Sequence, residues 1–125
     1  MKKVIQTENA PKPAGPYSQG IKVDKFLFIS GQIAIDPAQG KIVASDIRAQ
    51  TKTVMKNIKA ILQAADYNLT HVVQSNVYLS SMALFKEFNK EYAKYFDKEF
   101  PTRATVGIEL MPSALVEISM IAYKE

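Results

Sequence analysis

Between Asp46 and Asp66 the chain repeats apolar positions every three or four residues, which is the period of an α-helix with one buried face. The stripe consists of Ile47, Thr51, Val54, Ile58, Ile61, Leu62 and Ala65. Either Ser45 or Asp46 can cap the start of this helix. Because an apolar stripe needs a surface to pack against, the segments around it decide what the chain can fold into.

β-branched and aromatic residues predict strands on both sides of this first helix. Before it, Ser18–Val23 and Phe26–Ile35 flank Asp24-Lys25 and predict a hairpin that ends in the loop Asp36–Gly40. After it, Val72–Leu79 is apolar enough for a strand with neighbours on both sides. Ahead of the hairpin, closely spaced prolines predict an ordered, turn-rich lead-in, so that regular structure begins near residue 17.

A second amphipathic helix should follow the central strand. Its apolar side is formed by Met82, Phe85, Phe88, Tyr92, Tyr95 and Phe96. We expect this helix to end at Phe100-Pro101, because a proline disfavours helical geometry in the residue before it. Two last strands, Arg103–Glu109 and Leu115–Tyr123, would form a tight antiparallel hairpin centred on Pro112.

These segments give the order β-β-α-β-α-β-β and the fold class α+β, with a mixed β-sheet and both helices packed on one face. A chain of 125 residues fits one hydrophobic core, so residues 1–125 are expected to form a single domain. The other face of the sheet would remain uncovered. A closed oligomer in which these free faces pack together is therefore plausible.

The composition excludes several kinds of chemistry. The chain has no cysteine and one histidine, His71, so it has no disulfide, no thiolate nucleophile and no multi-histidine metal site. Met1–Lys12 does not resemble a secretory signal, and no run of about 20 apolar residues is present. We therefore expect a soluble, cytoplasmic protein without membrane contact. The net charge of +4 indicates a mild preference for anions.

Arginine is rare in this chain: only Arg48 and Arg103 stand among 16 basic residues. In the expected C-terminal hairpin, Arg103 and Glu117 would line one polar surface, but four residues at roughly 3.3 Å each would separate them. Their tips then need not touch within one chain, and a meeting across a subunit boundary is an open alternative. The structural alternative makes Arg103 a strand-end cation and Glu117 an ion-pair partner. The Phe-Pro-Thr that precedes this rare arginine argues for a specific role.

Three dispersed motifs resemble those of the RidA (YjgF) family, and the similarity spans essentially the whole chain. The first is Phe100-Pro-Thr-Arg103-Ala-Thr-Val106, followed by Leu110-Met-Pro112 and Val116-Glu117-Ile118. The others are Ala14-Gly-Pro-Tyr17-Ser-Gln-Gly20, and Ile29-Ser-Gly-Gln32 with Asp36-Pro37 and Gly40.

The resemblance implies a homotrimer with a chorismate-mutase-like fold and pockets between neighbouring subunits. It also implies hydrolytic deamination of 2-imino acids, such as 2-iminobutanoate and 2-iminopropanoate, to 2-keto acids and ammonia. Arg103 would hold the substrate carboxylate, since a guanidinium presents a planar fork to it. Glu117 would orient or activate the attacking water. Imine hydrolysis needs no metal, cofactor or covalent nucleophile.

By the same resemblance, Tyr17 would close the pocket and hydrogen-bond the ligand or water, with Ser30 and Asn89 lining or supporting it and Thr105 contributing a main-chain contact. Each side chain also has a structural alternative, as a turn residue, a strand end or a local cap. Thr105 stands where many relatives have cysteine, which leaves the effect on selectivity open. Glu109 is a further departure, since small or basic residues are more usual there, and we expect it to lie in water.

Two alternative functions compete with imine hydrolysis. Arg48, Lys52, Lys56 and Lys59 form a basic stripe on the first helix that would suit RNA phosphates in a ribonuclease or translation inhibitor. We do not expect nucleic-acid binding, because lysines opposite an apolar stripe are typical of a solvated helix and no aromatic residue is interleaved for base stacking. A non-catalytic sensor of small acids would use the same arginine pocket, and the sequence does not separate it from an enzyme.

Overall fold

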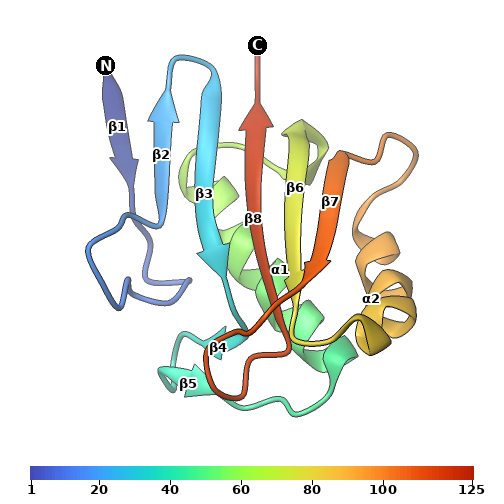
Figure 1. The fold of residues 1–125 in the computed structure, drawn as a ribbon. Coiled ribbons are helices and arrows are strands. Elements are labelled where there is room, and N and C mark those ends of the chain that lie inside the picture. Colours follow the sequence, from blue (N-terminus) through green and yellow to red (C-terminus); the bar gives the residue numbers. More distant parts are fainter.

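The computed structural model describes residues 1–125 and contains one six-stranded sheet with the strand order β1-β2-β3-β8-β6-β7 (Figure 1). The strands of this sheet are β1 (Lys2–Ile5), β2 (Gly20–Val23), β3 (Phe26–Gln32), β6 (Val72–Leu79), β7 (Thr102–Gly107) and β8 (Val116–Tyr123). A separate small hairpin consists of β4 (Ile35–Asp36) and β5 (Lys41–Ile42). Only β6 and β7 pair in parallel, so the sheet is mixed, as predicted.

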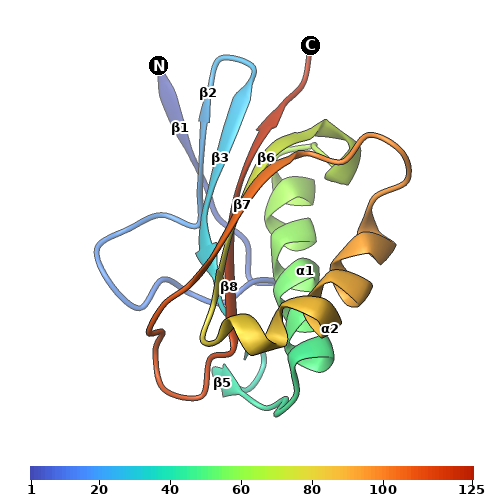
Figure 2. The same ribbon diagram turned by 45° about the vertical axis from the view of Figure 1, so that its right-hand side comes forward.

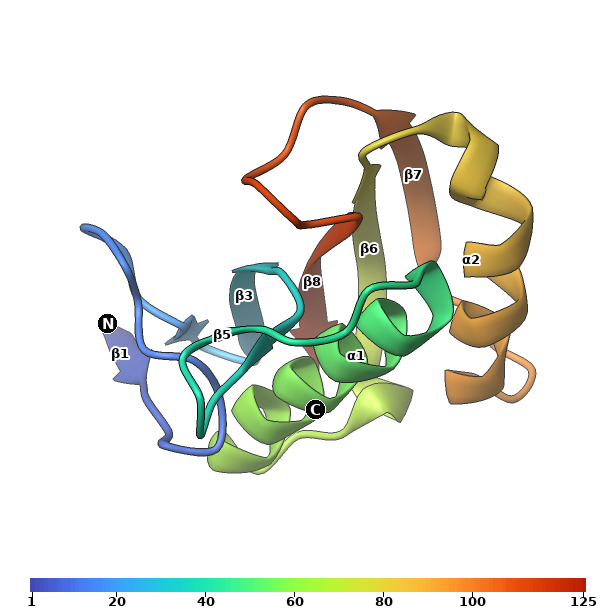
Figure 3. The same ribbon diagram turned by 90° about the horizontal axis from the view of Figure 1, so that it is seen from below.

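The helices are α1 (Ile47–Ala64) and α2 (Phe85–Tyr92), with short 3-10 helices at Leu69–His71, Met82–Leu84 and Ala93–Tyr95. Both α-helices lie on the same face of the sheet, which confirms the predicted α+β layers (Figure 2). The proline-rich lead-in and the connection from β7 to β8 project on the other side (Figures 2 and 3). We call that uncovered side the open face. None of the helices is long and apolar enough to span a bilayer.

The core lies between α1 and the central strands, where the predicted stripe meets the sheet. Val54, Ile58, Ile61 and Leu62 are fully buried, and each contributes about 1.5–3 kcal/mol relative to exposure. The Asp46 side chain caps α1 by accepting a hydrogen bond from the Ala49 N–H at 2.9 Å. The first helix is therefore confirmed, with the cap at the second of the two expected positions.

The central strand β6 has the predicted bounds, and β2 and β3 form the predicted hairpin around Asp24, which adopts a φ of 54°. The lead-in prediction was wrong at the start, because Lys2–Ile5 forms β1 and pairs with β2. This short segment has little periodicity of its own. Its strand conformation comes from the hydrogen bonds that β2 offers and from the burial of Ile5.

The second helix is shorter than predicted. It ends with the 3-10 turn Ala93–Tyr95, and Phe96 is already extended, with φ −129° and ψ 143°. With this backbone conformation, the centre of the Phe96 ring lies 5.1 Å from the centre of the Tyr92 ring and 6.0 Å from that of the Phe100 ring. The apolar side of this segment is thus completed by aromatic packing after the helix has ended.

The predicted C-terminal hairpin was wrong. β7 pairs in parallel with β6, while β8 lies between β3 and β6 and pairs with both in antiparallel fashion. The cause is the crossover through α2, which returns the chain parallel to β6 at the outer edge and leaves β8 to fill the centre. Met111-Pro112-Ser113 therefore belongs to a long connection and not to a tight turn.

Candidate functional site

Arg103 lies on edge strand β7 and is held by α2. One Nη of its guanidinium donates a hydrogen bond to Asn89 Oδ1 at 2.9 Å. The guanidinium carbon also lies 5.0 Å from the centre of the Tyr92 ring, 5.6 Å from that of Phe85 and 5.8 Å from that of Phe88. These are cation–π distances. Asn89 is its sole hydrogen-bond partner within the chain, so most of the fork remains free to bind an anion.

The buried hydroxyl groups of Ser75, Tyr92 and Thr105 lie beside Arg103 without a well-formed hydrogen bond, although Ser75 is close enough to Tyr92 to lower the pKa of its hydroxyl slightly against the effect of burial. Ser75 is the register partner of Arg103 in β6, and Thr105 lies two residues further along the same face of β7. Burial raises the pKa of Tyr92, so its hydroxyl stays protonated and able to donate. Unpaired buried donors of this kind commonly mark a place for a ligand or a water molecule.

Glu117 lies in β8 on the open face and lines a cleft of about 620 Å³. The cleft is also lined by Tyr17, Ser30, Gly31 and Met111. Glu117 is half-buried, and this burial raises the pKa of its carboxyl above the usual range. A carboxyl of this kind exchanges protons closer to neutral pH than an exposed glutamate does.

The lead-in reaches this cleft because Gln19 holds it in place. The buried Gln19 amide accepts a hydrogen bond from the Thr7 N–H at 2.7 Å and donates to the carbonyls of Thr7, Ala10 and Pro11. Tyr17, on the same loop, is half-exposed, and its hydroxyl accepts a hydrogen bond from the Ala14 N–H at 3.2 Å. The loop therefore presents the Tyr17 side chain from a fixed backbone.

Ser30 is tied to the same segment, since its hydroxyl donates to the Ser18 carbonyl at 2.5 Å and its N–H to the Gln19 carbonyl at 3.0 Å. Sequence reasoning missed Gln19 and Gly31 as contributors to this cleft. The motifs that contain them are recognisable in the sequence. The four hydrogen bonds of Gln19 to the loop and the contact of Gly31 with Glu117, however, depend on the three-dimensional fold.

The predicted site residues therefore fall into two groups. Tyr17, Ser30 and Glu117 meet at the open face, and we call them the carboxylate half. Arg103, Asn89 and Thr105 lie together under α2, and we call them the arginine half.

The expectation that Arg103 and Glu117 share one surface of a chain was wrong. Arg103 is in register with Ser75 and Glu117 with Tyr78, three residues along β6. Side chains an odd number of residues apart on a strand point to opposite faces. Within one chain, the two halves thus lie on opposite sides of the sheet.

Glu109 is exposed, as expected. It lines a second hollow of about 360 Å³ beside Glu117, together with Tyr78, Ile108 and Ser119. No three of the chain's acidic and histidine side chains come close enough to hold a metal ion.

Comparison with known proteins shows which sequences and folds this chain resembles. The family model described as Endoribonuclease L-PSP matches residues 7–124. A RutC family protein of Pyrococcus horikoshii is 55% identical over 126 residues, which cover 100% of both chains. The chloroplastic Reactive Intermediate Deaminase A of Arabidopsis thaliana is 40% identical over 122 residues, which cover 97% of this chain and 65% of that protein.

The solved structure of a Rid-family protein from Yersinia pestis, 41% identical, matches with a TM-score of 0.94 and covers 99% of this chain and 100% of that one. Sequence and fold thus agree over nearly the whole length. The chain belongs to the RidA/YjgF family, which has a reactive intermediate deaminase among its members.

Proposed function

We propose that this protein hydrolyses 2-imino acids, among them 2-iminobutanoate and 2-iminopropanoate, to 2-keto acids and ammonia without a cofactor. The observation that carries the proposal is the guanidinium of Arg103, which is held on three aromatic rings and Asn89 with most of its donors free. Such a fixed fork suits the carboxylate common to these substrates better than a lysine would. The family relation to a reactive intermediate deaminase supports the same reaction class.

In this proposal, Arg103 anchors the carboxylate and Glu117 handles the water. Water adds to the carbon of the C=N bond while Glu117 takes one of its protons and delivers it to the imine nitrogen, which gives a tetrahedral carbinolamine. Glu117 then takes the hydroxyl proton of the carbinolamine and delivers it to the amino group, so that the C–N bond breaks, ammonia leaves, and the C=O bond of the 2-keto acid forms. The raised pKa of Glu117 suits this two-way proton transfer. Tyr17 would hydrogen-bond the ligand or the water at the mouth of the cleft.

A complete site then requires two copies of the chain, one giving the arginine half and the next giving the carboxylate half. We propose a homotrimer in which the open faces meet. The open face carries exposed apolar side chains that support this assembly, namely Phe26 (41% exposed), Phe28 (44%), Val106 (45%) and Ile108 (52%). Sedimentation or small-angle scattering measures the state directly.

The decisive experiment generates 2-iminopropanoate or 2-iminobutanoate in situ with an amino-acid oxidase or dehydratase and follows its decay. Wild type should hasten decay, and Glu117→Gln should do so at least about 100-fold more slowly. Arg103→Lys should lower kcat/KM by about 10- to 150-fold, which corresponds to losing a hydrogen bond to a charged group worth about 1.5–3 kcal/mol. Decay that wild type leaves unchanged would refute the enzyme, and full activity of Arg103→Lys would refute the forked anchor.

A non-catalytic sensor of small acids would use the same arginine half. It predicts that pyruvate or 2-oxobutanoate binds to wild type and loses affinity in Arg103→Lys, while imine decay stays at the background rate. Calorimetric titration run beside the decay assay separates the two functions.

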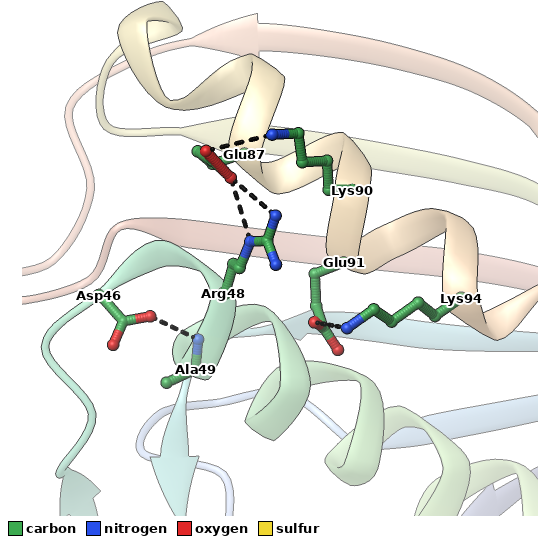
Figure 4. A network of polar contacts seen from close by, with 7 residues as sticks. All are labelled: Asp46, Arg48, Ala49, Glu87, Lys90, Glu91 and Lys94. Carbon is green, nitrogen blue, oxygen red and sulfur yellow. Dashed lines mark hydrogen bonds and ion pairs between the residues drawn. The ribbon is translucent and has the colours of Figure 1, made fainter.

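RNA binding is the second candidate, favoured by the description of the family model and by a cleft of about 650 Å³ lined by Lys52, Lys56 and Lys59, none of which forms an ion pair. Arg48, however, is not a free member of this stripe. It bridges α1 to Glu87 of α2, with Nη2 at 3.0 Å from the carboxylate (Figure 4).

Two further observations weaken RNA cleavage. Glu8 and Asp36 line the same cleft and reduce its attraction for phosphates. His71, the chain's one histidine, accepts the Asn68 N–H through Nδ1 at 3.0 Å in a helix cap, which leaves no histidine pair for acid and base catalysis. Replacing the three lysines with glutamine should abolish any RNA binding, and unchanged affinity would end this alternative.

A further inference from the structure

Gly31 of β3 lies directly against the side chain of Glu117. A Cβ atom built on Gly31 would overlap Glu117 Oε2 and would come within 3.0 Å of the carboxyl carbon and 3.2 Å of Cγ. An approach as close as that to Oε2 is essentially never found for a real Cβ atom, and the two carbon separations are tighter than nine in ten Cβ contacts. The carboxylate therefore occupies the space that any other residue at position 31 would fill with its side chain.

The register of the sheet explains this contact. Ile29 pairs with Met120 and Gln32 pairs with Ile118, so Ser30 and Gly31 together oppose Ser119 alone. This is a β-bulge, and bulges commonly redirect side chains next to active sites. Because of this extra residue, Gly31 of β3 lies beside Glu117, the residue before Ile118 in β8.

The backbone does not itself require glycine at this position. Gly40 is the chain's one glycine with a positive φ, at 70°, so Gly31 adopts a conformation open to any residue. What Gly31 contributes is space. Glycine is therefore needed at position 31 for the space that it leaves and not for its backbone conformation.

We propose that Gly31 is the positioning residue for Glu117: by lacking a side chain, it allows the carboxylate to lie in the cleft beside Tyr17 and Ser30. This inference rests on the proposed function and deepens it, because it states what keeps the water-handling group in place. A methyl group at position 31 would push the carboxylate away from β3 and toward solvent. Glu117 is long and flexible at its end, so the fold survives this displacement while the geometry of the cleft does not.

The test is a double-mutant cycle with Gly31→Ala, Glu117→Ala and the double variant, assayed for imine decay. Gly31→Ala should lower kcat by about 10- to 100-fold, because the displaced carboxyl loses part of the roughly 10²- to 10⁴-fold that a positioned acid or base contributes. In the Glu117→Ala background the same substitution should change kcat by less than about twofold, because the group it displaces is gone. An equal loss in both backgrounds would show that Gly31 acts by another route and would overturn the inference.

A second measurement does not depend on turnover. The Glu117 carboxyl is followed by carbon-13 NMR titration in wild type and in Gly31→Ala. Since burial is what raises the pKa of Glu117, displacement into solvent should return it toward the ordinary glutamate value. The acid limb of the rate profile should move to lower pH with it. A Glu117 titration that Gly31→Ala leaves unchanged would refute the role of Gly31.

Gly107→Ala is a matched control. It also adds a methyl group to a strand glycine, and its Cβ would lie 3.0 Å from Cγ of the flexible Met82 side chain, on the helix-covered face of the sheet. The Glu117 titration should therefore stay at its wild-type position in this variant. The two proposals can fail separately. A wild-type protein that does not hydrolyse imines would refute the proposed function only, whereas the titration of Glu117 tests the role of Gly31 without any turnover.

Discussion

The arginine half and the carboxylate half are built in different ways. Arg103 is fixed by side chains of a single helix, through three aromatic rings and one hydrogen bond to Asn89. Glu117 has no ion-pair or hydrogen-bond partner within the chain, and its surroundings come from a loop, a bulge and the open face of the sheet. In the proposed function, the group that binds the carboxylate is thus packed, whereas the group that exchanges protons is half-buried and unpaired.

Both arginines of the chain contact α2, one from β7 and one from α1. Neither serves as a general surface cation, for which the sequence uses lysine. The two halves also lie on opposite faces of one sheet, so the proposed site, which contains both, would form between two subunits.

The largest effect is expected from mixing the halves. Arg103→Ala and Glu117→Ala should each retain only a small residual activity alone, but unfolding and refolding them together at equal amounts should restore about a quarter of wild-type activity, since one site in four then draws both intact residues from different subunits across a head-to-tail interface. Activity is measured by imine decay, with separately refolded variants as controls. If no activity returns, each site takes both residues from one chain, and the division into halves fails.

The open face offers the next largest effect. Phe28→Asp places a charge among exposed apolar side chains and should dissociate the oligomer while leaving the fold of each subunit intact, because the Phe28 ring is already 44% exposed within one chain. We expect activity to fall by more than about tenfold together with the sedimentation coefficient. A variant that remains assembled, or an active monomer, would show that the open face is not the interface.

A smaller loss is expected when the platform of the arginine half is weakened. Asn89→Ala removes the hydrogen bond to Arg103 and should reduce kcat/KM by about tenfold, mainly through KM, as the guanidinium gains freedom. Lys90→Ala on the same helix is the control, since Lys90 contacts only the exposed Glu87 carboxylate, at 3.5 Å, and such pairs contribute little. A fall in kcat with KM unchanged would contradict a role in substrate anchoring.

The smallest effect concerns stability and pH in the carboxylate half. Because burial raises the pKa of Glu117 in the folded state, the native chain holds this proton more tightly than the unfolded chain does. Wild type therefore loses stability as the pH rises through the range between the ordinary and the raised pKa. Glu117→Gln should match wild type at about pH 4 and exceed it at pH 8, by less than about 1 kcal/mol since solvent screens the group.

Denaturant titrations at the two pH values measure this difference. Equal stability of wild type and Glu117→Gln at both values would mean that the carboxyl is as well solvated in the fold as in the unfolded chain. The arginine half supplies a contrast, because Asn89→Ala alters no titrating group and should change stability equally at both pH values.

Local patterns in the sequence predicted most of the elements. The stripe from Ile47 to Ala65 and the strand Val72–Leu79 are regular enough to be recognised alone. Pairing was harder. The sequence between Gly107 and Val116 contains a proline and suggests a turn, but only the crossover through α2 places β7 beside β6.

The candidate site was predictable to the same extent. Family motifs identified Arg103, Glu117 and Tyr17, yet no single-sequence signal shows that Arg103 stacks on α2 or that it lies on the opposite face from Glu117. Those relations depend on which strand lies between them. The role of Gly31 depends on a β-bulge, which is a property of two paired strands and cannot be recognised from the sequence of either strand alone.

The contact between Arg103 and α2 also has a consequence for the order in which the molecule forms. Asn89 and Arg103 are 14 residues apart along the chain, so this half involves a short loop closure. The cleft at Glu117 joins residues from positions 17, 30 and 117, and such distant contacts form late because their closure entropy must be overcome first. During refolding, amide protons of the helix that carries Asn89 should become protected from exchange before those of the proline-rich loop, and the cleft at Glu117 should be among the last parts of the chain to form.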